Sequence, residues 1–337
     1  MKHVAIDIHT HVEFAGTFAI LKKCYSEEEI FDRFVVSATG RYSAELNRKI
    51  MAGIRDALRD PEKKIRDMEA MRLAFNVLSS SPFAFLYEVE DDLAVELGRF
   101  HNDQLAEMVK SYPDRFAAMA TLPLQVPDEA LKELARATGT LGLRGVEIGS
   151  HVGKRELGDE VFWPIYKALE DLNMPIFIHP HHVAGLDRLL DFYLNNLIGN
   201  PLDTTISAAK LIFSGALEKY PKLKIILAHG GGQFPYIVGR WEHGYKVRPE
   251  CKEKVRKPPM AFFKNFYFDT ITHNPDALRY LVSIAGSDHV LLGTDYPYDM
   301  GDENPVQTVS QLTKIKAGDR QKIMRENAIA LYGLKIC

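Results

Sequence analysis

The stretch Val4–Val12, VAIDIHTHV, places two histidines one residue apart at the end of an apolar run. Side chains alternate between the two faces of a β-strand, so His9 and His11 should project from one face and Thr10 from the other. Two imidazoles held so close either meet solvent at the end of a strand or together contact something positively charged. The pair alone leaves both interpretations open, and partners elsewhere in the chain must decide between them.

The composition indicates a globular protein that acts on small molecules. The 337 residues are 46% hydrophobic and 26% charged, which suits a chain that buries a large core. The formal net charge is −3, so no basic field is available to attract nucleic acid or anionic lipid. We therefore expect a small-molecule ligand and neither a nucleic-acid nor a membrane partner.

The apolar runs and the cysteines of the sequence favour a cytoplasmic protein. The first twelve residues hold only a short apolar stretch, and no run approaches the roughly 20 apolar residues of a membrane span. Cys24, Cys251 and Cys337 are few and widely spaced, which argues against a disulfide framework and against a cysteine-based zinc site. We expect a cytoplasmic protein with free thiols.

Short apolar, β-branched runs recur along the chain and are separated by longer amphipathic segments. Such alternation predicts parallel βα units, either in an open doubly wound sheet or in a closed barrel. Eight runs favour a (β/α)₈ TIM barrel that uses residues 1–337 as a single domain. The strands that we predict are Val4–His9, Leu73–Ser79, Phe116–Leu122, Leu143–Ile148, Pro175–His179, Lys224–His229, Phe266–Thr270 and Val290–Asp295.

The helices that should cover this barrel lie between the strands. Several carry ordinary helix start or stop residues at their ends. The candidates are Asp91–Ser111, Pro127–Gly139, Glu160–Leu172, Asp203–Tyr220 and Asp276–Ala285.

One long segment interrupts the alternation. Residues 12–72 separate the first two strands, and we expect a helical insertion there, with a loop around Ala38–Tyr42 and a charged helix from Asp60 onward. Because the loops that follow barrel strands lie on the active face, this insertion should form a lid or pocket wall.

Further candidate ligands follow other predicted strands. His179, His229 and Asp295 each end an apolar run, as His9 and His11 do. The carboxyl ends of barrel strands converge on one face, so these five side chains should surround a single pocket. Imidazole nitrogens with one carboxylate suit a divalent transition metal such as Zn²⁺ or Mn²⁺. This convergence favours the interpretation that His9 and His11 bind a cation together.

The motifs resemble those of the amidohydrolase superfamily, and more narrowly the amidohydrolase-related decarboxylases typified by aminocarboxymuconate semialdehyde decarboxylase. The resemblance extends over nearly the whole chain. It implies that His9, His11, His179 and Asp295 bind one metal ion, and that His229 stands beside the metal as an acid or base. The motifs are DIHTHV, LRGVEIGSHVG, IFIHP, SGALEKYPKLKI, LAHGGGQFPYIVGR and VLLGTDYPY.

The same resemblance suggests substrate contacts. It implies that Arg240 binds a substrate carboxylate, that Phe192 and Tyr298 line the pocket, and that the protein is a homodimer in which Arg240 reaches the neighbouring chain's site. Guanidinium suits this role because its planar fork pairs with both carboxylate oxygens.

The chain also departs from the family pattern. His181 and His182 stand where the family often carries an aromatic residue after His-Pro. The family's second carboxylate-binding arginine has no aligned match, and Arg48 and Arg55 are the alternatives. The strand-four end, Glu147–Ser150, lacks the lysine that a two-metal site would use, so we expect one metal.

We therefore predict a metal-dependent, non-oxidative decarboxylase of a small unsaturated or aromatic carboxylic acid, in which His229 or Asp295 handles the proton. The alternative from another class is a metal-dependent hydrolase or hydratase that uses the same residues on a carbonyl, lactone or double bond. A binding protein on an inactive barrel is the third possibility, although such a protein would be expected to have lost ligands.

Overall fold

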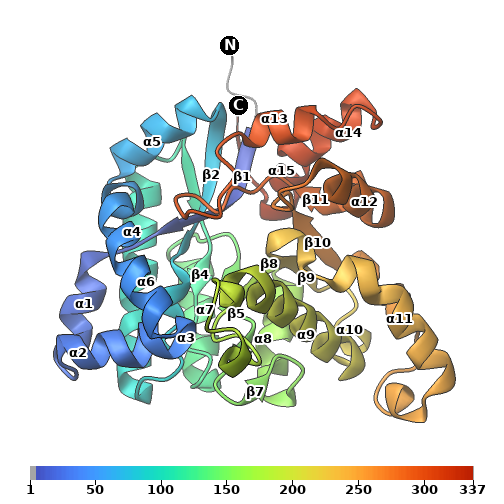
Figure 1. The fold of residues 1–337 in the computed structure, drawn as a ribbon, viewed down its shortest axis with the longest axis horizontal. Coiled ribbons are helices and arrows are strands. Elements are labelled where there is room, and N and C mark those ends of the chain that lie inside the picture. Colours follow the sequence, from blue (N-terminus) through green and yellow to red (C-terminus); the bar gives the residue numbers. More distant parts are fainter. Residues whose placement is uncertain (1–4, 337) are drawn as a thin grey trace.

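The computed structural model describes residues 5–336, and the fold is the predicted TIM barrel (Figure 1). One sheet has three strands, in the order β1-β2-β3, and another has six, in the order β11-β10-β9-β8-β5-β4. Since β3 and β4 are two halves of one strand interrupted at Met119, the barrel has eight strand positions within the described residues. The barrel strands are β1 (Ala5–Val12), β2 (Leu73–Ser80), β3 (Phe116–Ala118), β4 (Ala120–Thr121), β5 (Val146–Gly149), β8 (Pro175–His179), β9 (Lys224–Leu227), β10 (Phe266–Asp269) and β11 (Val290–Leu291).

Backbone hydrogen bonds close the barrel at both junctions between the sheets. Ile8 N donates to Leu292 O at 3.1 Å, and His11 N donates to Tyr296 O at 2.9 Å, which joins β1 to the end of β11. Met119 N donates to Leu78 O, and Ala120 N donates to Gly145 O, both at 2.9 Å. All neighbouring barrel strands pair in parallel, so their carboxyl ends share one face.

A β-bulge in β1 sets the direction of the two histidines. The pairing with β2 shifts between Asp7 and Thr10, so the alternation of faces changes phase there. Ile6 and Ile8 lie in an apolar cluster with Phe177 from β8, and the ring of His9 also contacts Phe177, at 4.8 Å between centroids. The bulge thus lets apolar residues fill the barrel interior, while His9 and His11 face the same interior nearer the carboxyl ends of the strands.

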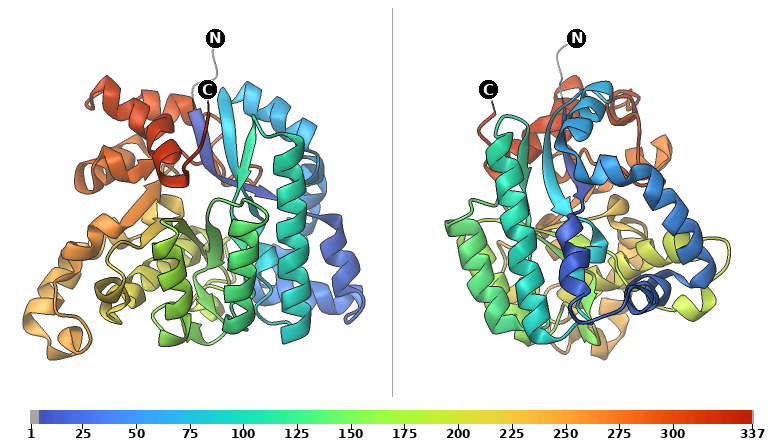
Figure 2. Two further views of the ribbon diagram at one scale, coloured as in Figure 1. Left: turned by 180° about the vertical axis from the view of Figure 1, so that it is seen from behind. Right: turned by 90° about the vertical axis from the view of Figure 1, so that its left-hand side faces the viewer.

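Helices surround the barrel (Figure 2). Two of them, α6 and α7, have the bounds that the sequence predicts. A separate hairpin of β6 (His151–Val152) and β7 (Arg155–Glu156) follows β5. The helices are α1 (Ala15–Leu21), α2 (Glu27–Ile30), α3 (Ser37–Thr39), α4 (Arg41–Arg59), α5 (Pro61–Ala70), α6 (Asp91–Ser111), α7 (Pro127–Gly139), α8 (Trp163–Asp171), α9 (Asn200–Phe213), α10 (Ala216–Lys219), α11 (Phe234–Val247), α12 (Pro275–Ala285), α13 (Pro305–Ser310), α14 (Ala317–Gln321) and α15 (Asn327–Tyr332).

Several predicted boundaries need correction. The helix predicted over Asp203–Tyr220 begins at Asn200 and is divided at Gly215, whose φ of 86° is left-handed. The loop predicted around Ala38–Tyr42 is reduced to a break at Gly40, where φ is 79°. The first strand extends beyond His9 to Val12, while the last strand ends at Leu291. The predicted strand start at Val4 and the thiol of Cys337 lie outside the described residues.

The segment between β1 and β2 is helical and is tied to the barrel. Asp60 caps the start of α5 by accepting a hydrogen bond from Glu62 N at 2.9 Å. From this helix the fully buried Lys64 donates to His11 O at 2.9 Å and lies 4.4 Å from the ring centre of Tyr296. The described helices include none whose length and apolar character would allow it to cross a membrane.

Candidate metal centre and active site

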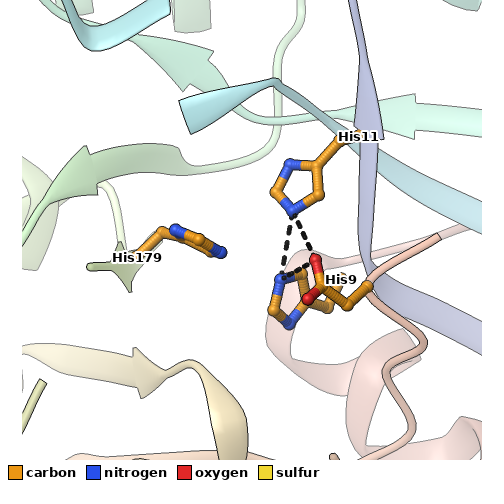
Figure 3. A group of neighbouring side chains, drawn as sticks. His9, His11 and His179 are labelled. Atoms are coloured by element: carbon orange, nitrogen blue, oxygen red, sulfur yellow. Dashed lines mark hydrogen bonds and ion pairs between the residues drawn. The ribbon is translucent and has the colours of Figure 1, made fainter. Parts of the chain in front are cut away.

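Three histidines converge at the carboxyl end of the barrel (Figure 3). His9 and His11 come from β1, and His179 is the last residue of β8. All three are buried, and Figure 3 shows His179 lying across from the other two. Together with Asp295 they form a set whose nearest ligand atoms all lie within 4.8 Å of one another.

Asp295 brings the carboxylate to this set. It lies in the loop after β11, has a left-handed φ of 59°, and donates its backbone N–H to His9 O at 2.8 Å. Its Oδ1 lies 3.3 Å from His9 Nε2 and 3.2 Å from His11 Nε2. Its Oδ2 lies 3.4 Å from His229 Nε2, so one carboxylate contacts the imidazoles of His9, His11 and His229.

The electrostatics of the set favour a cation. Burial lowers the pKa of His11, and it lowers the pKa of His179 well below its usual value. Burial would also lower the pKa of His9, but the Asp295 and Asp269 carboxylates outweigh it and raise that pKa to about 10. Burial works against ionisation of Asp295, yet the charge on His9 and hydrogen bonds from the histidines hold its pKa well below the usual range. A positive charge is therefore stabilised between the carboxylates.

These residues fit a divalent metal ion. His179 Nε2 is buried and has no hydrogen-bond partner among residues 5–336, as expected of a donor that awaits a ligand. Three imidazole nitrogens and one carboxylate oxygen are donors that Zn²⁺ and Mn²⁺ accept. His179 Nδ1 lies 3.0 Å from Pro180 O, which leaves Nε2 directed to the centre.

Asp269, at the end of β10, is a residue that the sequence analysis missed. Its Oδ2 accepts from His9 Nδ1 at 2.7 Å and from His229 N at 2.8 Å, and its Oδ1 accepts from Gly230 N at 2.7 Å. It therefore orients one histidine by its ring and another by its backbone. Its signal in the sequence is an acidic residue that ends the apolar run of the seventh predicted strand.

His229 follows β9 in a tight turn. Its left-handed φ of 56° and the hydrogen bond to Asp269 aim its ring at the centre, where it lies 5.1 Å from the ring of His179. Its Nδ1 is buried and has no hydrogen-bond partner among the described residues. An imidazole with a free ring nitrogen beside the metal set can accept or donate a proton there.

Two further side chains border the set. The ring of Tyr298 lies 5.3 Å from that of His11, and its hydroxyl shares a 2.6 Å hydrogen bond with Ser81 Oγ. Glu147, on β5, is fully buried, and its Oε1 lies 3.9 Å from His11 Nδ1. Burial raises the pKa of Glu147 to about 8.

The other predicted substrate contacts lie on the surface of this single chain. Arg240 is exposed on α11, and Phe192 is 84% exposed in the segment before α9. Arg48 and Arg55 are both exposed on α4, and the guanidinium of Arg48 lies over the ring of Phe31. The structure therefore unites the predicted metal residues, His229 and Tyr298, but not these arginines or Phe192.

An open hollow of about 550 Å³ begins at His229. Its walls come from α9, α11, α12 and the loop after β10, and they include Pro201, Tyr236, Ile271 and Tyr280. Tyr236 is 80% exposed and Tyr280 43%, so the outer part of the hollow is apolar surface.

Comparison with known proteins agrees with this geometry. The amidohydrolase family model matches residues 6–334. The chain is 30% identical to a 2-amino-3-carboxymuconate-6-semialdehyde decarboxylase of Dictyostelium discoideum over 99% of this chain and 92% of the relative.

Two solved structures are similar over nearly their full length. A 2,6-dihydroxybenzoate decarboxylase complexed with 2,6-dihydroxybenzoate has a TM-score of 0.82 at 26% identity, covering 99% of this chain and 100% of that one. A mutant 5-carboxyvanillate decarboxylase of Novosphingobium aromaticivorans has a TM-score of 0.85 at 25% identity, covering 98% and 97%, and holds manganese and 3-methoxy-4-hydroxy-5-nitrobenzoic acid. On the extent of the family match and the arrangement of its strand-end histidines, this chain belongs to the amidohydrolase family.

Proposed function

We propose that the protein releases CO₂ from a small, planar, unsaturated or aromatic carboxylic acid, using one divalent metal ion held by His9, His11, His179 and Asp295. It is a metal-dependent carboxy-lyase of the amidohydrolase family. The observation that carries the proposal is the convergence of these four donors in a chain whose full-length relatives are decarboxylases. The intact ligand set argues against an inactive scaffold.

The metal residues create the electrophilic part of the site. A bound divalent ion supplies positive charge that stabilises negative charge developing on the substrate. Asp269 fixes the orientation of His9 through the 2.7 Å hydrogen bond to its Nδ1. The strands position His11 and His179, and the hydrogen bond from Asp295 N to His9 O positions the carboxylate, so the site is organised before substrate arrives.

Proton transfer falls to His229 and Asp295. Decarboxylation breaks the bond between the carboxylate and the reacting carbon, leaves the electron pair of that bond on the carbon, and adds a proton in place of CO₂. The 3.4 Å separation of His229 Nε2 from Asp295 Oδ2 allows the two groups to share this proton, and His229 Nδ1 has no competing partner among residues 5–336.

Substrate binding is assigned to Arg240, Phe192 and Tyr298, with Arg240 contributed by the partner in a homodimer. The exposed position of Arg240 on α11 and the apolar surface of Tyr236 and Tyr280 nearby support this part of the proposal. Light scattering should then give the mass of a dimer, and full activity in a monomer would contradict the shared site.

Three further assignments belong to the proposal. The nitrogen-rich donor set supports Zn²⁺ as the resident metal, with Mn²⁺ as the alternative. The free Cys24 and Cys251 agree with a reducing compartment such as the cytoplasm. The single barrel supports one domain over residues 1–337, with residues 12–72 as an inserted wall of the pocket.

The test compares acids with their neutral derivatives. Purified, metal-loaded protein is offered hydroxybenzoates and carboxylated muconate semialdehydes, together with the corresponding methyl esters and lactones, while CO₂ release and hydrolysis are followed in parallel. We expect CO₂ from at least one acid, without oxygen or an organic cofactor. Hydrolysis of an ester or lactone with no CO₂ from any acid would favour the hydrolase.

A further inference from the structure

A second group of ligand-type side chains lies at the same end of the barrel. Glu88 belongs to the loop between β2 and α6, and His181 and His182 belong to the loop that follows β8. Their nearest ligand atoms all lie within 4.8 Å of one another. None of the three belongs to the metal set of the active site.

The distances within this group suit a bound ion. His182 Nε2 lies 3.4 Å from Glu88 Oε1, and His181 Nε2 lies 3.9 Å from the same oxygen. Donors that share a tetrahedral Zn²⁺ at about 2.0–2.2 Å stand roughly 3.4 Å apart. The group therefore needs only a small closure to bind one ion.

Donor atoms of all three side chains lack a hydrogen-bond partner among the described residues. His181 Nε2, His182 Nε2 and Glu88 Oε2 are buried, yet none has a hydrogen-bond partner among residues 5–336. The side chain of His181 is only 10% exposed and that of His182 only 16%. Since buried polar atoms in native proteins are almost always paired, these three atoms call for a ligand.

Neighbouring residues hold the loop in place. Ser150 Oγ accepts from His181 N at 3.3 Å, and His151 Nε2 lies 2.9 Å from His182 O. Asp203, on α9, accepts from Ala184 N at 3.1 Å. His182 itself has a left-handed φ of 52°, a conformation that such surroundings must maintain. The backbone that carries the two imidazoles is thus held in place before any ion arrives.

From these observations we infer that Glu88, His181 and His182 form a second binding site for a divalent transition metal ion, separate from the active-site metal. Two imidazoles and one carboxylate bind Zn²⁺, and such a set leaves coordination positions open for water or a carboxylate. This inference goes beyond the proposed function and does not depend on it.

The test counts metal ions in wild-type protein and in matched variants. Metal-free protein is dialysed against a small excess of Zn²⁺, and bound zinc per chain is measured by mass spectrometry. We expect about two ions in the wild type and about one in His182→Ala and in the isosteric Glu88→Gln. His243→Ala, which changes an exposed histidine on α11, is the control and should retain two.

The double variant His179→Ala/His182→Ala separates this inference from the proposed function. It should bind no zinc, whereas His179→Ala alone should keep the ion at the second site. One ion in wild type that persists in both His182→Ala and Glu88→Gln would overturn the second site and leave the active-site metal standing. One ion that disappears in Glu88→Gln but persists in His179→Ala would support the second site and contradict the first. Circular dichroism confirms that each variant is folded.

Discussion

The proposed metal residues occupy very different surroundings from Phe192 and Arg240, two of the proposed substrate residues. His179 is 5% exposed at the end of a barrel strand, whereas Phe192, in the next loop, is 84% exposed. Strand ends in a closed barrel have little freedom, so their side chains meet at one point whatever the substrate. Loops and helix surfaces can vary without disturbing that point. We infer from this difference that the barrel determines the reaction class, whereas residues on its rim determine the choice of substrate.

The largest effect should come from removing a strand-end ligand. His179→Ala should lose the active-site metal and nearly all CO₂ release, a greater loss than the about 10²- to 10⁴-fold that a general acid or base supplies. Metal analysis beside a turnover assay checks this, with His243→Ala as a surface control. Retention of both the ion and the activity would show that the barrel end does not hold the catalytic metal.

Removing His229 should separate metal binding from proton transfer. His229→Ala should keep the active-site metal but lose about 10²- to 10⁴-fold in turnover, because its ring touches Asp295 without being needed as a ligand. Metal content and kcat measured on one preparation test this. Loss of the ion in this variant would make His229 a ligand and require a different proton donor.

Asp269 should have a smaller effect, through the residues that it orients. Asp269→Asn keeps the shape of the side chain but weakens the hydrogen bond to His9 Nδ1, and should cost about 10- to 100-fold in metal affinity or activity. Competition against a chelator measures the affinity. Wild-type affinity and kcat would mean that the strand alone positions His9.

The variant Arg240→Ala tests the proposed role of an exposed residue in substrate binding. Loss of a hydrogen bond to a charged group costs about 1.5 kcal/mol or more, so kcat/KM should fall about tenfold or further, with a raised KM, while the metal stays bound. A lower kcat as well would mean that the scissile carboxylate is misplaced. Lys246→Ala, on the same helix, is the matched control, and an equal effect in both variants would exclude a specific role.

The last effect concerns stability and leaves the chemistry of the site aside. Because burial raises the pKa of Glu147 from 4.5 to about 8, the folded metal-free protein binds an extra proton between these pH values. The free energy of unfolding should therefore fall as pH rises through this window, by about 1.4 kcal/mol per pH unit for this proton. Urea unfolding of Glu147→Gln should show a flatter dependence on pH. The exposed Glu303→Gln should keep the wild-type slope, and an equal slope in all three proteins would refute the raised pKa of Glu147.

Much of this account could be predicted from sequence because it depends on strand ends. Apolar runs locate the strands, and the polar residue that ends each run locates the site, as for His179 and Asp295. The bulge in β1 could not be predicted, because it depends on pairing with β2. Asp269 was missed because its partners, His9 and the backbone of His229, are distant in sequence. The exposure of Arg240 and Phe192 depends on how loops and helices pack. Neither this packing nor a contact in the proposed dimer leaves a local pattern in the sequence.

X-ray diffraction at the absorption edge of the bound metal tests the central claim most directly. Crystals are grown from wild-type protein whose CO₂ release has been measured, and the anomalous map is calculated without a metal in the phases. The account predicts a peak within about 2.0–2.2 Å of donor atoms of His9, His11, His179 and Asp295. Active protein with no peak between these four side chains would contradict it.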